Sequence, residues 1–302
     1  MDATTAFFEE ELVKIIGEVE RVEYGNKIAR DVLPFDAKGS RGSQALKQYV
    51  LDRVGYMRLK EKVSDKVELT DISKTAVYLP LLISENGFQY DIDEIAAAME
   101  SNTSLDAEKA SAVLEAYEEM INRVAFIGQS DLGLTGLANN ANVDIDTSMG
   151  ATFAAATSEQ RVTFFAGLLG LVYTGSGNTI QPDTLIIPSA EYVQLGEKTY
   201  SASGVVTDKS ELEMLQTRVN GMYGNVTIKS SLELEAQGAA GVQRAVAYQK
   251  SPRVLYFEET LPVEYQPVQR TNNVFKVPTF SKVGGVFVRR PYGIQYGDYS
   301  KA

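Results

Sequence analysis

The stretch LDAEKASAVLEAYEEMINRVAFIGQSDLGLTGLANN, residues 105–140, decides the fold of this chain. Its first part carries apolar residues at steps of three and four, which is the spacing of a helix with one apolar stripe. The stripe comprises Leu105, Ala110, Val113, Leu114, Tyr117, Ile121 and Val124. Thr103 and Asp106 offer a capping-box-like start, and three glycines, at 128, 133 and 136, mark the exit. We predict a helix of about 22 residues, roughly 33 Å long, that ends in a glycine turn.

The charged residues of this helix lie mostly off the apolar stripe. They are Glu108, Glu115, Glu118, Glu119 and Arg123. Charges gathered on the face opposite an apolar stripe are typical of a solvated helix surface. We interpret them as such a surface and not as an active site.

The composition limits what chemistry the chain can perform. Its 302 residues are 44% hydrophobic, which is enough to bury the core of one large or two ordinary domains. There is no cysteine, so disulfides and thiolate sites are excluded, and there is no histidine, the commonest general acid or base. We predict no catalytic residue, no cofactor and no metal site. An enzyme that uses carboxylates and lysines remains an alternative.

Three short motifs match functional patterns only in part. GSGNT, residues 175–179, has two glycines of a dinucleotide loop but follows a helix-like run and lacks the third glycine. The carboxylates of DIDE, from Asp91, and DIDTS, from Asp144, do not continue into a calcium-binding loop. We predict turn and helix-cap roles for them.

The net charge of −11 argues against a surface dedicated to nucleic acid, but the charge is uneven. Between residues 270 and 302, Asp298 is the only acidic residue. The basic residues there are Arg270, Lys276, Lys282, Arg289, Arg290 and Lys301. A local basic surface is therefore expected. The longest apolar run, residues 164–173, is far shorter than the roughly 20 residues of a membrane span, so no membrane partner is expected.

Two segments read as the strands of a long hairpin. QYVLDRVGYMRL and KTAVYLPLLISENGFQY are rich in β-branched, aromatic and aliphatic residues, and a charged stretch separates them. A hairpin has little core of its own, so it needs a partner surface. That surface belongs either to the same chain or to a neighbouring subunit.

The second half of the chain alternates helix-like and strand-like pieces. SEQRVTFFAGLLGLVY, SAEYVQLGE and SELEMLQTRVNGMYG have helical patterns, whereas PDTLIIP and NVTIKSS read as strands. Such alternation predicts helices around a small sheet. From Ala245 onward the chain is mostly strand-like, and Gly284 and Gly285 suit a turn or bulge.

Four segments, taken in order, resemble the major capsid proteins of tailed bacteriophages with the Hong Kong 97-type shell fold. They are YGNKIARDVLPFD (residues 24–36), SLDAEKASAVLEAYEEMINRVAFIGQSDLGLTGLANN (104–140), PDTLIIPSAEYVQL (182–195) and GGVFVRRPYGIQYGDY (284–299). The resemblance implies an α+β fold with an N-terminal arm at 1–47 and an extended hairpin loop at 48–90. A peripheral domain would follow at 91–150 with a spine helix at 105–128. An axial domain would occupy 151–255, and return strands of the peripheral domain 256–302.

The resemblance also implies a function. Hexamers and pentamers of the chain would form an icosahedral head that encloses double-stranded DNA, held by weak non-specific contacts, and would assemble in the host cytoplasm. A portal protein, a scaffold and a decoration protein would be further partners. The expected contacts between subunits are Arg53, Arg58, Lys60, Glu61, Lys62, Lys66 and Lys74. Arg270, Lys276, Lys282, Arg289 and Arg290 would face the lumen.

Two alternatives to a phage head shell are also protein assemblies. An encapsulin compartment would use the same fold to package enzymes, and its gene would neighbour a cargo enzyme instead of a terminase and portal. Another virion component, such as a tail protein, would form rings or tubes.

Overall fold

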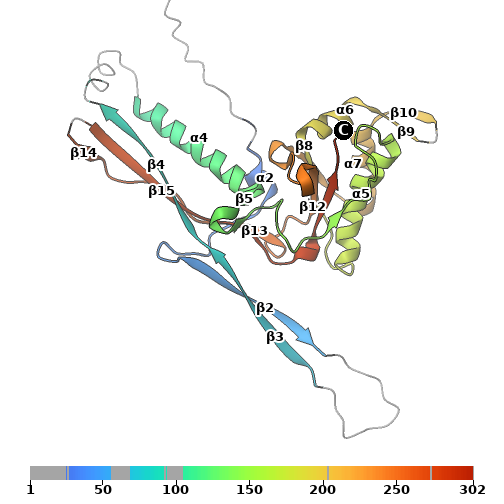
Figure 1. The fold of residues 1–302 in the computed structure, drawn as a ribbon, viewed down its shortest axis with the longest axis horizontal. Helices are drawn as coiled ribbons and strands as arrows, with labels where there is room; N and C mark the ends of the chain where they lie inside the picture. Colours follow the sequence, from blue (N-terminus) through green and yellow to red (C-terminus); the bar gives the residue numbers. More distant parts are fainter. Residues whose placement is uncertain are drawn as a thin grey trace, which may run out of the picture.

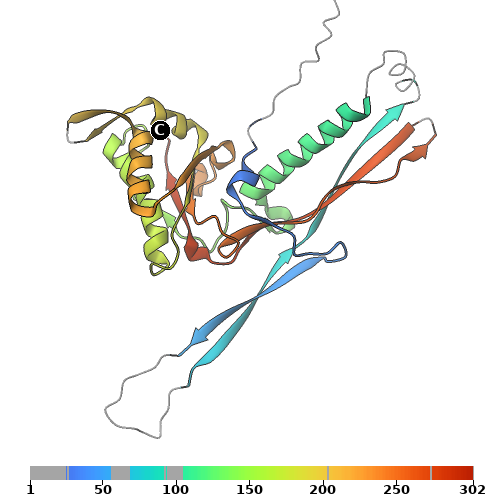
Figure 2. The ribbon, with the colours of Figure 1, turned by 180° about the vertical axis from the view of Figure 1, so that it is seen from behind.

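The computed structural model describes residues 25, 27–55, 69–91, 93, 105–202, 204–272 and 274–301. This part of the chain forms two lobes from which one hairpin projects (Figures 1 and 2). Both lobes combine helices with sheet, so the predicted α+β class is confirmed. None of the described helices is long and apolar enough to cross a membrane.

The first lobe is a long sheet with a helix along it. Its strands are β1 (Phe35–Asp36), β4 (Leu82–Asp91), β13 (Leu255–Tyr265), β14 (Gln269–Thr271) and β15 (Val274–Val288). β15 is the central strand, because β13, β14 and β4 all pair with it antiparallel. The ladder skips a residue where Glu258 pairs with Gly285 and Glu259 with Val283, which makes the expected bulge at Gly284 and Gly285.

Helix α4 (Leu105–Phe126) lies along this sheet and confirms the predicted helix, although it ends two residues earlier than expected. Gly128 stops it by adopting a φ of +72°. The buried stripe includes Val113, Tyr117, Ile121 and Val124. The sequence pattern also placed Leu114 on the stripe. Its side chain is 47% exposed, because it lies at the edge of the stripe, next to the solvent-facing side of the helix.

The short helix α2 (Ala29–Val32) packs beside α4. The Ala29 amide at its start donates to Asn122 Oδ1 of α4 at 3.2 Å. Ala29 and Val32 are both buried, so this helix covers part of the α4 surface. The segment before the hairpin is therefore fixed to the first lobe.

The projecting hairpin consists of β2 (Ala45–Val54) and β3 (Asp71–Pro80), paired antiparallel over ten residues. The sequence interpretation extended this hairpin to residue 90, which is wrong for residues 82–90. Those residues form β4 and pair with β15 in the first lobe. The chain changes sheet at Leu81, whose side chain is buried.

The second lobe wraps helices around a mixed five-stranded sheet. Its order is β11 (Thr227–Ser231), β8 (Thr184–Pro188), β12 (Gln243–Tyr248), β16 (Ile294–Tyr299) and β7 (Ile145–Asp146). The helices are α5 (Ser158–Gly175), α6 (Ser189–Glu197) and α7 (Glu211–Tyr223), and β9 (Thr199–Ala202) pairs with β10 (Val205–Ser210) in a separate hairpin. The predicted alternation of helix and strand is confirmed. Capping boxes at Thr157 and Ser210 fix where α5 and α7 begin.

The last strand corrects the expected domain boundaries. Residues 256–302 were expected to return to the peripheral domain, and β13 and β15 do lie in the first lobe. β16, however, pairs with β12 and β7 in the second lobe. The 3₁₀ turn Pro291–Gly293 redirects the chain. Gly297 then allows α5 to pack closely, since a Cβ there would lie 2.6 Å from Leu168 Cδ1.

One continuous hydrophobic core joins the two lobes. Its buried residues include Val32 and Ile121 from the first lobe, and Phe165 of α5, Ile186 of β8 and Tyr248 of β12 from the second. The Tyr248 hydroxyl donates to the Val32 carbonyl at 2.7 Å, which ties the two lobes together at their boundary. The lobes are therefore parts of one packed subunit.

Candidate functional site

The hairpin exposes large apolar side chains. Leu69 is 86% exposed, Ile72 65% and Tyr78 63%, and Tyr49 and Val77 are exposed as well. A two-stranded hairpin is marginally stable alone in water, and contiguous exposed apolar surface usually marks an interaction site. The hairpin is therefore a candidate binding surface. Its large apolar residues were not among the predicted contacts, although β-branched and aromatic residues in this segment signalled them.

Of the predicted hairpin contacts, Lys74 is the one whose side chain the structure places. It is exposed, and its Nζ lies 3.7 Å from the centroid of the Tyr49 ring. Arg53 pairs with Ile72 in the strand ladder, but its side chain lies outside the described residues. Arg58, Lys60, Glu61, Lys62 and Lys66 also lie outside them.

The base of the hairpin is anchored firmly in the first lobe. Leu46 and Leu79 pack against Tyr256 and Phe287 in a small apolar cluster. Two cations also stack on the Tyr256 ring, with Lys38 Nζ 3.8 Å and Arg289 Cζ 4.9 Å from its centroid. The hairpin thus projects from a fixed root.

The predicted basic surface near the C-terminal end is only partly formed. Arg270, Lys276 and Arg290 are exposed, whereas Arg289 is half-buried against Tyr256. Lys282 is 5% exposed, and its Nζ donates to the Arg41 carbonyl at 2.9 Å. Lys282 is therefore a correction to the predicted set, because the segment around Arg41 covers its side chain.

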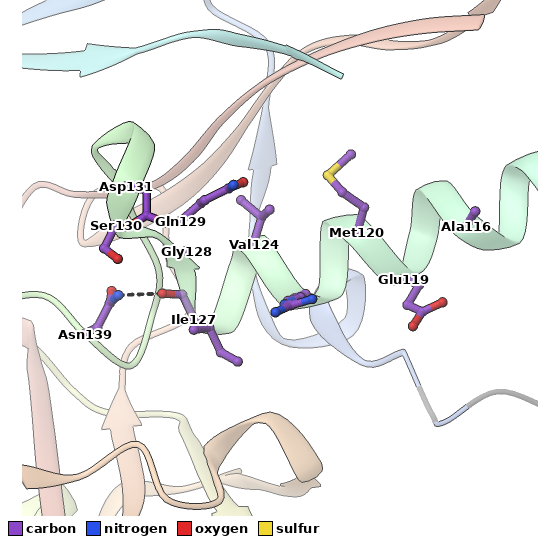
Figure 3. Close-up of a pocket in the computed structure, with 11 residues that line it drawn as sticks. Ala116, Glu119, Met120, Val124, Ile127, Gly128, Gln129, Ser130, Asp131 and Asn139 are labelled. Carbon is purple, nitrogen blue, oxygen red and sulfur yellow. Dashed lines mark hydrogen bonds between the residues drawn. The ribbon is translucent and has the colours of Figure 1, made fainter. Parts of the chain in front are cut away.

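A groove runs along the C-terminal end of α4 (Figure 3). Its volume is about 570 Å³, and the turn after the helix closes one end of it. Met120, Val124 and Ile127 supply its apolar wall, and Glu119, Arg123 and Asp131 supply its charges. The Asn139 side chain donates to the Ile127 carbonyl and accepts from the Gly136 amide, so the turn that borders the groove is held in place.

Buried ion pairs stiffen the second lobe, and sequence reasoning missed them. Arg161 of α5 donates from Nε and Nη2 to Glu211, the first residue of α7. Arg244 of β12 donates from Nε and Nη2 to the two carboxylate oxygens of Asp298 on β16, both at 2.7 Å. Each pair joins residues at least 50 positions apart, so no local pattern could have revealed it.

Glu191 is a further buried acidic residue that the sequence did not reveal. It is fully buried in the first turn of α6, and neither carboxyl oxygen has a hydrogen-bond partner. The Tyr299 hydroxyl is also buried without a partner. Burial raises the pKa of Glu191, because the charged form loses its hydration.

Two of the three short motifs have structural roles in the described chain. GSGNT ends α5, where Gly177 and Asn178 adopt positive φ angles. Asp146 of DIDTS accepts from the amide and hydroxyl of Ser148, which is the predicted turn role. Among the described residues, no group of three or more acidic side chains is placed to hold a metal ion.

Comparisons with known proteins agree with this architecture. A family model described as major capsid protein matches residues 59–299. The capsid of Myoviridae phage XM1 is similar in structure, with a TM-score of 0.82 at 18% identity over 96% of this chain and 97% of that one. A Mycobacterium phage Ogopogo structure gives 0.65 at 12% identity over 99% and 100%.

A holo-SrpI encapsulin complex from Synechococcus elongatus gives a TM-score of 0.57 at 11% identity over 99% of this chain and 96% of that one. No curated protein sequence matches the chain. These structural likenesses confirm the expected Hong Kong 97-like fold. Because the family model covers most of the sequence, the chain belongs to the major capsid protein family and is a structural protein of a capsid shell.

Proposed function

We propose that this capsid protein forms the head shell of a tailed phage from pentamers and hexamers that enclose double-stranded DNA. The exposed apolar hairpin is the observation that carries the proposal. Ile72 and Tyr78 are more than half exposed on a hairpin rooted in a rigid lobe. Neighbouring subunits would cover this surface, so folding and assembly would be linked.

The proposal includes a polarity for the shell. Four basic residues would face the lumen and contact DNA phosphates weakly: Arg270, Lys276, Arg289 and Arg290. The net charge of −11 would keep the overall attraction between the shell and the DNA weak. Assembly would take place in the host cytoplasm, with a portal protein, a scaffold and a decoration protein as partners. The chain would act as a structural protein, and its lack of histidine and cysteine removes the commonest general base and the thiol nucleophile.

Light scattering after size-exclusion chromatography, followed by electron microscopy, tests the shell. Closed particles or five- and six-membered rings are expected. A compact monomer at all concentrations, with lysate factors added, would contradict the proposal. Nuclease-protected DNA in the particles would support the phage head, and a packaged enzyme in its place would support the encapsulin alternative.

A further inference from the structure

The sequence contains two Asn–Gly pairs, Asn86–Gly87 and Asn220–Gly221. In such a pair the main-chain nitrogen of the glycine can attack the asparagine side chain, because glycine has no Cβ to obstruct the approach. The attack closes a five-membered imide and releases the side-chain nitrogen as ammonia. Both pairs share this local chemistry, so the structure around each pair decides whether the reaction takes place.

The first pair lies in the middle of β4, and its reacting groups are neighbours. The Gly87 amide donates to Asn86 Oδ1, with 2.8 Å between the nitrogen and the oxygen. The atom that would be attacked, Asn86 Cγ, is bonded to that oxygen. Both residues are exposed, so hydroxide and water can reach them.

The Gly87 amide is not part of the sheet ladder. Among the described strands only β15 pairs with β4, and Gly87 stands opposite Pro278 in that pairing. The Pro278 carbonyl accepts from the Gln266 amide, which lies beyond the end of β13 on the other side of β15. In an antiparallel ladder the two opposite residues either both face each other or both face away. The Gly87 amide therefore points to the edge of the sheet, away from β15.

The second pair is held by a helix. Asn220 and Gly221 lie inside α7, where hydrogen bonds between successive turns occupy the main-chain amides. Asn220 Oδ1 also accepts from the Val226 amide at 3.0 Å and from the Gln216 side chain at 2.8 Å. These bonds hold the Asn220 carboxamide in place. The structure thus protects one Asn–Gly pair and leaves the other able to react.

An opening of about 130 Å³ between α4 and the sheet gives the reaction room. Asn86 lines this opening together with three hydroxyl-bearing residues, Ser84, Thr279 and Ser281. A polar space of this size can hold water. Water can therefore approach the Asn86 side chain, and ammonia can leave.

We propose that Asn86 is a site of spontaneous deamidation. Hydroxide removes the Gly87 amide proton, the nitrogen bonds to Asn86 Cγ, and the carboxamide nitrogen leaves as ammonia. Water then opens the imide at Cγ to give aspartate, or at the main-chain carbonyl to give isoaspartate. One water is consumed and one ammonia is released, and the chain stays unbroken. The reaction needs no second subunit, so it is independent of the proposed shell.

The products change β4 in two ways. Aspartate places a negative charge beside the opening under α4, and isoaspartate also adds one methylene to the main chain. The added methylene disturbs the register between β4 and β15 at residue 86, so the sheet edge loosens as the protein ages. Asn86→Asp reproduces the charge without the methylene and separates the two effects.

Peptide mapping by mass spectrometry tests the site. Folded, unassembled subunits kept in mildly alkaline buffer should gain about 1 Da in the peptide that contains Asn86, at least about tenfold faster than in the peptide that contains Asn220. A methyltransferase specific for isoaspartate should label the first peptide. The rate should rise about tenfold per pH unit, because hydroxide removes the amide proton. In concentrated urea both pairs should react at similar rates, since unfolding removes the protection by α7.

Asn86→Gln is the matched variant. Its carboxamide is one methylene longer, so ring closure would need a six-membered imide, and the mass gain at this position should disappear. Gly87→Ala is a poorer choice, because the new Cβ would lie 2.7 Å from the Val277 carbonyl oxygen and disturb the strand. Equal rates at the two pairs in folded subunits would overturn the proposal. An unmodified Asn86 peptide in a folded sample whose urea control reacts would do the same, as would a rate that does not rise with pH.

Discussion

The buried pair Arg161 and Glu211 gives a sharp test of how the second lobe is held together. Glu211 is fully buried and accepts from three donors, which are Arg161 Nε and Nη2 and the Ser158 hydroxyl, the last at 2.6 Å. Arg161 also donates from Nη1 to the carbonyls of Phe153 and Ala156. The pair therefore links α5, α7 and the loop before α5.

Arg161→Met would remove two of the three donors to Glu211 and leave two loop carbonyls without theirs. Breaking a buried ion pair by removing one partner costs about 3–5 kcal/mol, because the other charge stays buried. For a domain of this size that corresponds to a fall in melting temperature of roughly 6–20 °C. The double variant Arg161→Met/Glu211→Leu should recover most of the loss, since apolar replacement of both partners is often neutral.

Urea unfolding of unassembled subunits measures these values. The chain has no tryptophan, so tyrosine fluorescence and circular dichroism report unfolding. Arg218→Met is the control, because exposed Arg218 bridges the same two helices through Thr163 and should lose no more than about 0.5 kcal/mol. A loss below about 1 kcal/mol in Arg161→Met, or a double variant as unstable as the single one, would refute the reasoning.

Three further predictions concern single residues. Gly136→Ala should destabilise the turn after α4 by about 1–3 kcal/mol in urea unfolding, because its Cβ would lie 2.4 Å from the Phe126 carbonyl oxygen; an unchanged midpoint would show that the turn relaxes freely. Glu191→Gln should raise stability at neutral pH and flatten its pH dependence. The raised pKa means that the native state binds the proton more tightly, so the wild type loses stability as pH rises from about 4.3 through the native pKa. Melting curves from pH 4 to 8 that are parallel for both proteins would contradict this. Leu79→Ala should cost about 2–4 kcal/mol and speed hydrogen exchange in β2 and β3, because Leu79 packs with Tyr256 and Phe287 at the hairpin root; exchange at the wild-type rate would place the anchor elsewhere.

Several tertiary features lay beyond sequence reasoning. Residues 82–91 have the same strand-like composition as β3, so nothing local indicated that the chain leaves the hairpin at Leu81 and joins β15. Lys282 was expected at a basic surface, but its exposure depends on the distant segment around Arg41. The sheet that β16 joins was also not predictable from local sequence, because its partner strands β12 and β7 are far away in the sequence.

The sequence by itself determined the elements whose signals are local. The period of apolar residues predicted α4, α5 and α7, and the glycines predicted where α4 ends and where β15 bulges, because backbone conformation depends on near neighbours. The four family-like segments led to the fold class and the capsid family. Only the tertiary structure decided which strand joins which sheet, which charges are buried in pairs and which apolar side chains the hairpin exposes. Those properties depend on contacts between residues distant in the chain, where burial and pairing energies outweigh local preference.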